Sequence, residues 1–113
     1  MSIKERAKAQ FAERATVELA IPEWGGSIFY RAPNLHVYKE CIAESKGDQV
    51  EFNARLVVAC AKDANGEPIW RKAEVVELMR EYDPKIITYI ASEITKTIAL
   101  ATTPADMAEA EKN

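Results

Sequence analysis

The stretch 48-DQVEFNARLVVAC-60 predicts the central helix of the chain. Asp48 stands three residues before Glu51, a relative of the capping-box pattern with which helices begin. Apolar side chains then recur on one face at helical spacing, namely Phe52, Leu56, Ala59 and Cys60, and are widened by Val57 and Val58. We therefore expect a core helix that runs from Asp48 to about Lys62.

Two more helices are predicted after this one. The segment 63-DANGEP-68 is a turn, because Asn-Gly tolerates left-handed backbone and Pro68 blocks continuation; Trp70 behind it is expected to anchor in the core. A helix is predicted from Lys72 to Tyr82, with four apolar side chains inward: Val75, Val76, Leu78 and Met79. Asp83-Pro84 then caps a last helix, on which isoleucine recurs every three or four residues: Ile87, Ile90, Ile94 and Ile98.

A β-hairpin is predicted over residues 16–31, before the helices. Apolar residues alternate along its first strand, Val17, Leu19 and Ile21. Pro22 ends that strand, Gly25-Gly26 can supply the positive φ of a tight turn, and 27-SIFYR-31 returns. Since a two-stranded hairpin is marginal in water, we expect it to lie against helices or a partner.

The remaining segments complete a mainly α, small α+β domain. Asn34 can cap a helix over 35–45 that ends at Lys46-Gly47 and carries an apolar stripe of Leu35, Tyr38 and Ile42 with Cys41 alongside. Residues 2–14 favour a helix with little apolar surface, either frayed or docked, and residues 102–113 are expected to form a mobile tail. We expect one domain over 1–113, with a helical core at 34–101 and the hairpin at its edge.

Composition argues against several functional classes. The 113 residues carry a net charge of −3, and their 15 Lys and Arg residues are scattered, which argues against a nucleic-acid partner but leaves a local basic patch open. With one histidine and no CxxC pair, no metal or cofactor site is expected, and Cys41 and Cys60 are expected to be reduced and either buried or half-buried. The catalytic motifs GxSxG, HExxH and the P-loop are absent from the sequence, so we expect no enzyme. Without a signal peptide or a long apolar run, the chain is expected to be cytosolic, with no membrane partner.

Three aromatic residues of the hairpin are candidates for binding a partner: Trp24, Phe29 and Tyr30. Phe29 and Tyr30 are neighbours in a strand, so they point to opposite faces and cannot both face one core. Either one of them, or Trp24, is offered to a partner, or the hairpin packs on one face with Tyr30 half exposed. Both interpretations stay open at this point.

Three segments together resemble the tail assembly chaperones of long-tailed bacteriophages. They are 21-IPEWGGSIFYRAP-33, 52-FNARLVVACAKDANGEPIW-70 and 73-AEVVELMREYDPKIITYIASEI-94. The matching positions are Trp24, Gly25, Gly26 and Arg31, then Arg55, Leu56 and Val57, then Asp63, Gly66 and Pro68. The resemblance covers roughly residues 16–98; the chain departs from it in having Asn34-Leu35 where the family has a Thr-rich helix start.

The resemblance implies a function without catalysis. Such proteins bind the tape-measure protein, keep its long helices from aggregating, help recruit tail-tube subunits, and leave before the tail is complete. It further implies a location in the host cytoplasm, self-association, and a longer frameshifted product that shares this region. The alternative from another class is a small DNA-binding regulator, with 73–82 and 84–99 as a helix-turn-helix, although the last helix offers only Lys85 and Lys96 to phosphates.

Overall fold

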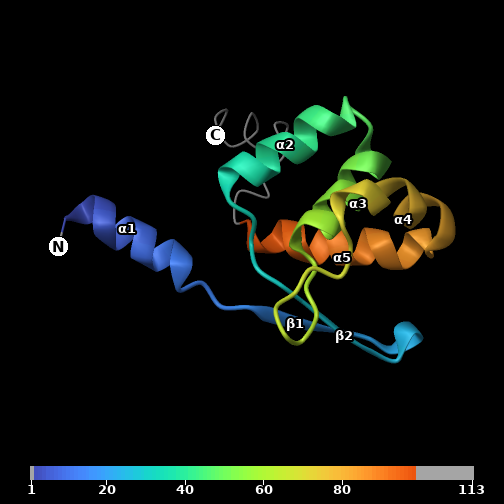
Figure 1. Ribbon diagram of the computed structural model, residues 1–113, viewed down its shortest axis with the longest axis horizontal. Helices are drawn as coiled ribbons and strands as arrows, with labels where there is room; N and C mark the ends of the chain where they lie inside the picture. Colours follow the sequence, from blue (N-terminus) through green and yellow to red (C-terminus); the bar gives the residue numbers. More distant parts are fainter. Residues whose placement is uncertain (1, 99–113) are drawn as a thin grey trace, which may run out of the picture.

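The computed structural model describes residues 2–98, and its elements follow the predicted order (Figure 1). The elements are α1 (Ile3–Ala12), β1 (Val17–Ile21), the 3₁₀ turn η1 (Pro22–Trp24), β2 (Gly26–Tyr30), α2 (Leu35–Ser45), α3 (Gln49–Cys60), the 3₁₀ turn η2 (Lys72–Glu74), α4 (Val75–Glu81) and α5 (Pro84–Thr97). The predicted α+β, mainly α class with an N-terminal hairpin is confirmed. The tail predicted at 102–113 lies outside the described residues, as do the last three residues of the predicted 34–101 core.

Helix α3 is the centre of the fold, because α2, α4 and α5 all pack against it. The Asp48 side chain caps it by accepting from the backbone N–H groups of Val50 (2.9 Å) and Glu51 (3.2 Å). The helix ends at Cys60, two residues before the predicted end at Lys62. Lys62 leaves the helix because its backbone pairs with Phe29 of β2: the Lys62 N–H donates at 2.7 Å and its carbonyl accepts at 2.9 Å.

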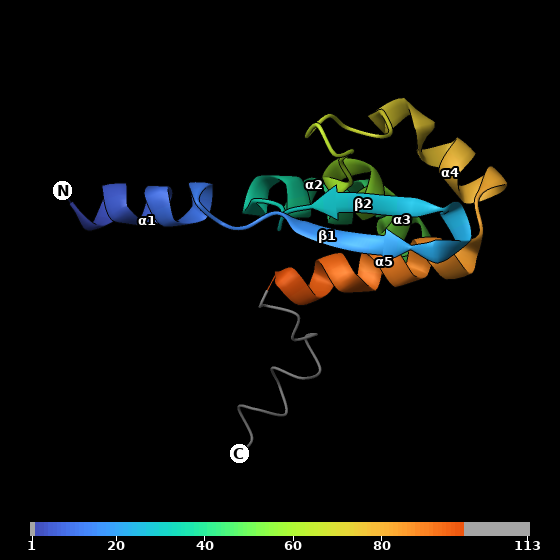
Figure 2. The same ribbon diagram turned by 90° about the horizontal axis from the view of Figure 1, so that it is seen from below.

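The hairpin presents one face to the helices. Its strands pair so that Leu19 lies opposite Ile28 and Val17 opposite Tyr30. Opposed residues of an antiparallel pair point to the same face, so these side chains share the inner face. The reversal uses the η1 turn followed by Gly25, whose φ of +69° is a left-handed conformation that glycine adopts without strain. Figure 2 shows the two strands running alongside α5.

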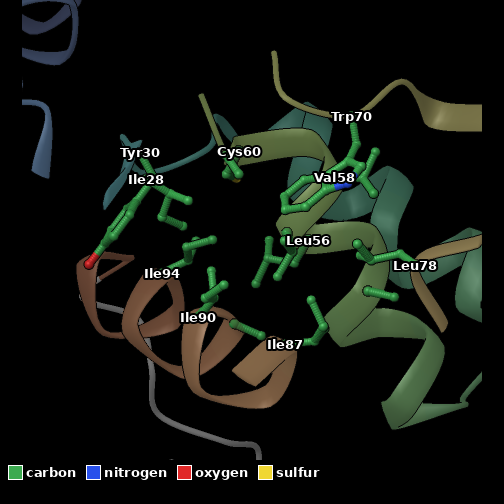
Figure 3. Packing of buried hydrophobic residues seen from close by; sticks show 14 of the residues in the cluster. Ile28, Tyr30, Leu56, Val58, Cys60, Trp70, Leu78, Ile87, Ile90 and Ile94 are labelled. Atoms are coloured by element: carbon green, nitrogen blue, oxygen red, sulfur yellow. The ribbon is translucent and has the colours of Figure 1, made fainter. Parts of the chain in front are cut away.

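The core is formed by α3 and α5 with the inner face of the hairpin on one side and α4 on another. The predicted isoleucine face of α5 is confirmed at Ile87, Ile90 and Ile94, which are buried together with Ile86 and Ala91. Ile98 differs from the prediction, because the helix ends at Thr97 and Ile98 is only half-buried. In Figure 3, Ile28 of β2 lies next to Ile94, while Leu56 and Leu78 enter the same cluster from α3 and α4. Trp70 is also buried, which confirms the predicted anchor.

Two apolar faces differ from the prediction. On α4, Val75 and Leu78 are buried, but Val76 is 56% exposed and Met79 is also exposed, so the prediction that all four point inward is wrong. The short α4 packs on α3 along one side only. Val75 and Leu78, which are three residues apart, lie on that side of the helix, whereas Val76 and Met79 do not.

The stripe on α2 is divided in the same way. Cys41 is buried and Tyr38 packs against Phe52, with ring centroids 5.8 Å apart, whereas Leu35 is 72% exposed and Ile42 is exposed. The side of α2 that faces α3 passes through Cys41 and Ser45 instead. Leu35 and Ile42 therefore add apolar surface to the outside of the domain.

Helix α1 forms but buries no residue, and it projects from the body of the domain (Figures 1 and 2). Its C-terminal end is held by Arg31, whose guanidinium donates to the carbonyls of Phe11 (2.8 Å) and Ala12 (3.1 Å). A cation at this end also complements the helix dipole. None of the helices within residues 2–98 has the length and apolar character needed to cross a membrane.

Candidate partner-binding groove

Two adjoining hollows form a concave surface beside α2. One, of about 950 Å³, lies between the end of α1, β2 and the loop 63–66; the other, of about 410 Å³, lies between α2, α3 and residues 68–72. They share Val37, Ala59 and Lys62, and we call them together the α2 groove. Its apolar lining includes Phe29, Val37, Val58, Ala59, Trp70 and Val75.

Local backbone chemistry builds the outer wall of the groove. The Asp63 carboxylate accepts from the backbone N–H groups of Asn65 (2.8 Å) and Glu67 (3.0 Å), which closes the turn that follows α3. Gly66 completes this turn with a φ of +82°. Because Lys62 pairs with Phe29 on one side and Pro68 on the other, the turn is held beside β2.

A charged cluster lies at the second hollow. Glu44 of α2 pairs with Lys72 (2.8 Å) and with Arg55 of α3 (3.1 Å), and Arg55 also pairs with Glu51 at 2.9 Å. The hydrogen bond from Lys72 lowers the pKa of Glu44, and the same contact raises the pKa of Lys72. Both groups are therefore ionised at neutral pH, and the cluster ties α2 to α3 and to the start of η2.

The tip of the hairpin is fixed by three aromatic rings. Trp24 packs edge-on against Trp70 and Tyr82, with centroid separations of 6.2 and 5.9 Å, and Trp70 packs on Tyr82 at 5.6 Å. The Trp70 indole N–H also donates to the Tyr82 hydroxyl at 3.2 Å. Trp24 keeps 37% of its surface exposed, so it fastens the hairpin to the body and still presents an edge to solvent.

The structure separates the three predicted partner-binding residues. Tyr30 is only 2% exposed, because it lies on the inner face of the hairpin with Ile28, and burial raises the pKa of its hydroxyl. The alternative of a half-exposed Tyr30 is therefore wrong, although Tyr30 does line the α2 groove beside Phe29. Phe29 is half-buried and lines the α2 groove, whereas Trp24 lies in the aromatic cluster at the tip. Partner binding by Trp24, Phe29 and Tyr30 stays a prediction.

Sequence reasoning missed most of the groove. The cations of the groove come from α1, from Arg31 just after β2, from α3 and from the segment 62–72, so no local pattern of basic residues marks them. Sequence reasoning also placed Val76 and Met79 in the core, whereas both side chains are exposed. A partial signal existed for Lys62, which follows the last apolar residues of the predicted helix directly.

Metal-ligating side chains do not cluster in the described part of the chain. Within residues 2–98, no three His, Cys, Asp or Glu side chains are placed to hold a metal ion. Cys41 and Cys60 are free and buried, as predicted, and burial raises the pKa of Cys60 to about 12. Neither thiol is therefore available as a thiolate at neutral pH.

Comparison with known proteins gives one informative similarity. Neither a protein-family model nor a curated protein matches this chain. Among solved structures, the tail assembly chaperone of bacteriophage HK97 is similar, with a TM-score of 0.62 over 85% of this chain and 96% of that chain, at 18% sequence identity. At this identity the similarity shows a shared fold, and it confirms at that level the resemblance seen over residues 16–98.

Proposed function

We propose that the chain is a tail assembly chaperone of a long-tailed bacteriophage or prophage. In this role it binds the tape-measure protein without covalent chemistry and helps to recruit tail-tube subunits. The observation that carries the proposal is the fold shared with the HK97 tail assembly chaperone, which extends over 96% of that protein. The three sequence segments described above support the same function independently of the fold comparison.

The surface of the domain suits binding that must later be released. The α2 groove offers an apolar floor, and further apolar side chains lie exposed on α2 and α4, including Leu35 and Val76. Apolar contact supplies affinity without directional bonds, and contact areas of moderate size give complexes that dissociate. A chaperone that shields long helices and then leaves needs this combination.

The wider setting follows from the same proposal. The chain acts in the host cytoplasm, is not a component of the finished virion, has no enzymatic activity, and works without a cofactor, nucleic acid or membrane. Its partners are the tape-measure protein, the tail-tube protein, further copies of itself and a longer frameshifted form. Each of these partners is separately testable.

Co-expression provides the first test. The tape-measure protein encoded beside this chain is produced with and without the chain carrying an affinity tag. We expect the two proteins to copurify. Failure to copurify, with the tape-measure protein equally insoluble in both cultures, would contradict the proposal.

A helix-turn-helix regulator is the alternative. Helices α4 and α5 are joined by only Tyr82 and Asp83, a shorter connection than the turn of about three to four residues in such motifs, and the main apolar face of α5 is buried against α3. A gel shift with duplex DNA decides between the two functions: salt-sensitive binding supports the regulator, and no shift at low salt counts against it.

A further inference from the structure

The α2 groove has a charge opposite to that of the chain. Six cationic side chains line it: Lys8, Arg31, Arg55, Lys62, Arg71 and Lys72. Only three carboxylates do so: Glu40, Glu44 and Asp63. The whole chain is nevertheless acidic, with a net charge of −3, so the positive charge is concentrated in the groove.

The carboxylates of the groove are already engaged. Glu44 pairs with Lys72 and Arg55, Asp63 closes its own turn, and Glu40 lies 2.9 Å from Nε2 of His36. Among the cations, Arg55 and Lys72 pair with Glu44, and Arg71 pairs with Glu74. Lys8 and Lys62, by contrast, form no ion pair within residues 2–98. These two lysines can therefore attract the carboxylates of a segment that binds in the groove.

The backbone of the groove favours a helical occupant over an extended one. A strand binds by adding to a free sheet edge. Here the edge of β2 at Phe29 is paired with Lys62, and Lys62 is paired again with Pro68. Farther along the wall, Pro33 has no N–H to donate. An occupant that satisfies its own backbone hydrogen bonds is a helix, and it would bind through side chains set against the apolar floor.

The position of α1 fits the same occupant. This helix is ten residues long, buries none of them, and yet contributes Lys8 and Phe11 to the groove. Isolated helices of this length are marginal in water. A bound helix would cover Phe11 from the open side and would stabilise α1.

We propose that the α2 groove binds an acidic amphipathic helix of a partner protein. The apolar face of that helix lies on Phe29, Val37 and Ala59, and its carboxylates face Lys8 and Lys62. The inference deepens the proposed function, and it relies on that function only to identify the protein that carries the helix. Its test uses a model peptide, so its failure leaves the copurification of the tape-measure protein unaffected.

The test measures binding of two peptides to the full chain. Both are fluorescein-labelled, cross-linked helices with leucines at positions i, i+3, i+4 and i+7; one carries glutamates on its polar face and the other lysines at the same positions. Fluorescence anisotropy is recorded at low and high salt. We expect the acidic peptide to bind more tightly than the basic one and to weaken as salt rises.

Charge-reversed variants locate the site. The double variant Lys8→Glu, Lys62→Glu should lower affinity for the acidic peptide by about tenfold or more, because two attractions become repulsions. The matched control Lys39→Glu, Lys85→Glu makes the same charge change at exposed positions outside the groove and should bind like the wild type. Circular dichroism confirms that each variant is folded, and hydrogen exchange should show α1 amides protected by the acidic peptide.

Four outcomes would overturn the inference. The first is equal binding of the two peptides, and the second is equal loss of affinity in the groove and control variants. The third is concentration-dependent self-association in sedimentation that the groove variant abolishes, which identifies a second copy as the occupant. The fourth is binding of the acidic peptide only after removal of residues 102–113, which identifies the acidic end of this chain as the occupant.

Discussion

Trp24 provides the most direct test of how the hairpin is held. Replacing it with alanine removes two edge-on ring contacts, to Trp70 at 6.2 Å and to Tyr82 at 5.9 Å. Truncating a fully buried tryptophan to alanine costs about 3–5 kcal/mol. Because Trp24 is 37% exposed, we scale this cost to its buried portion and expect Trp24→Ala to lower the free energy of unfolding by roughly 2–3 kcal/mol.

Urea denaturation followed by far-UV circular dichroism measures this change. Val76→Ala serves as the control, because Val76 is more than half exposed and truncation of a surface side chain changes stability by only about 0.5 kcal/mol or less. In hydrogen exchange, Trp24→Ala should lose protection first in residues 17–30, since the ring fastens the hairpin to the body. A loss below about 0.5 kcal/mol, the size of an ordinary surface effect, would refute the reasoning.

Three further predictions follow from local contacts. Asp48→Ala removes the cap of α3 and should lower the free energy of unfolding by about 1 kcal/mol in urea denaturation. Lys39→Ala, at an exposed position of α2, should change it little, and equal effects of the two substitutions would contradict the capping role. Both cysteines should resist a thiol reagent at pH 8 in the native protein and react quickly in urea, because burial raises the pKa of each thiol. Fast labelling of the native protein would contradict their burial. Glu44 has a pKa below its ordinary value of 4.5, so its contact with Lys72 contributes stability above that value, and this contribution is lost as pH falls through the lowered pKa. Lys72→Met should therefore be less stable than the wild type at pH 7 but not at strongly acidic pH, and a pH-independent difference would contradict the ion pair.

Local features of the fold could be predicted because their causes are local. The caps at Asn34, Asp48 and Asp83 each accept a backbone N–H within three residues, so the sequence around them is sufficient. The isoleucine repeat of α5 likewise specifies a buried face by its spacing alone, since that helix is long and has one strongly apolar side.

Features that depend on distant segments could not be predicted. Helical spacing shows that α4 has an apolar face, but only the position of α3 decides that Leu78 is buried and Val76 exposed. Strand alternation placed Phe29 and Tyr30 on opposite faces without saying which face the helices cover. The pairing of Lys62 with Phe29 joins residues far apart in the chain, and that contact forms the α2 groove.

The central claim is that this chain acts as a tail assembly chaperone, and the solubility of the tape-measure protein tests it most directly. The tape-measure protein encoded beside this chain is produced alone, with the wild-type chain, or with an unrelated acidic helical protein of similar size, and the soluble fraction after centrifugation is quantified. We predict that only the wild-type chain moves most of the tape-measure protein into the soluble fraction. An unchanged soluble fraction, or an equal rise with the unrelated protein, would contradict the account.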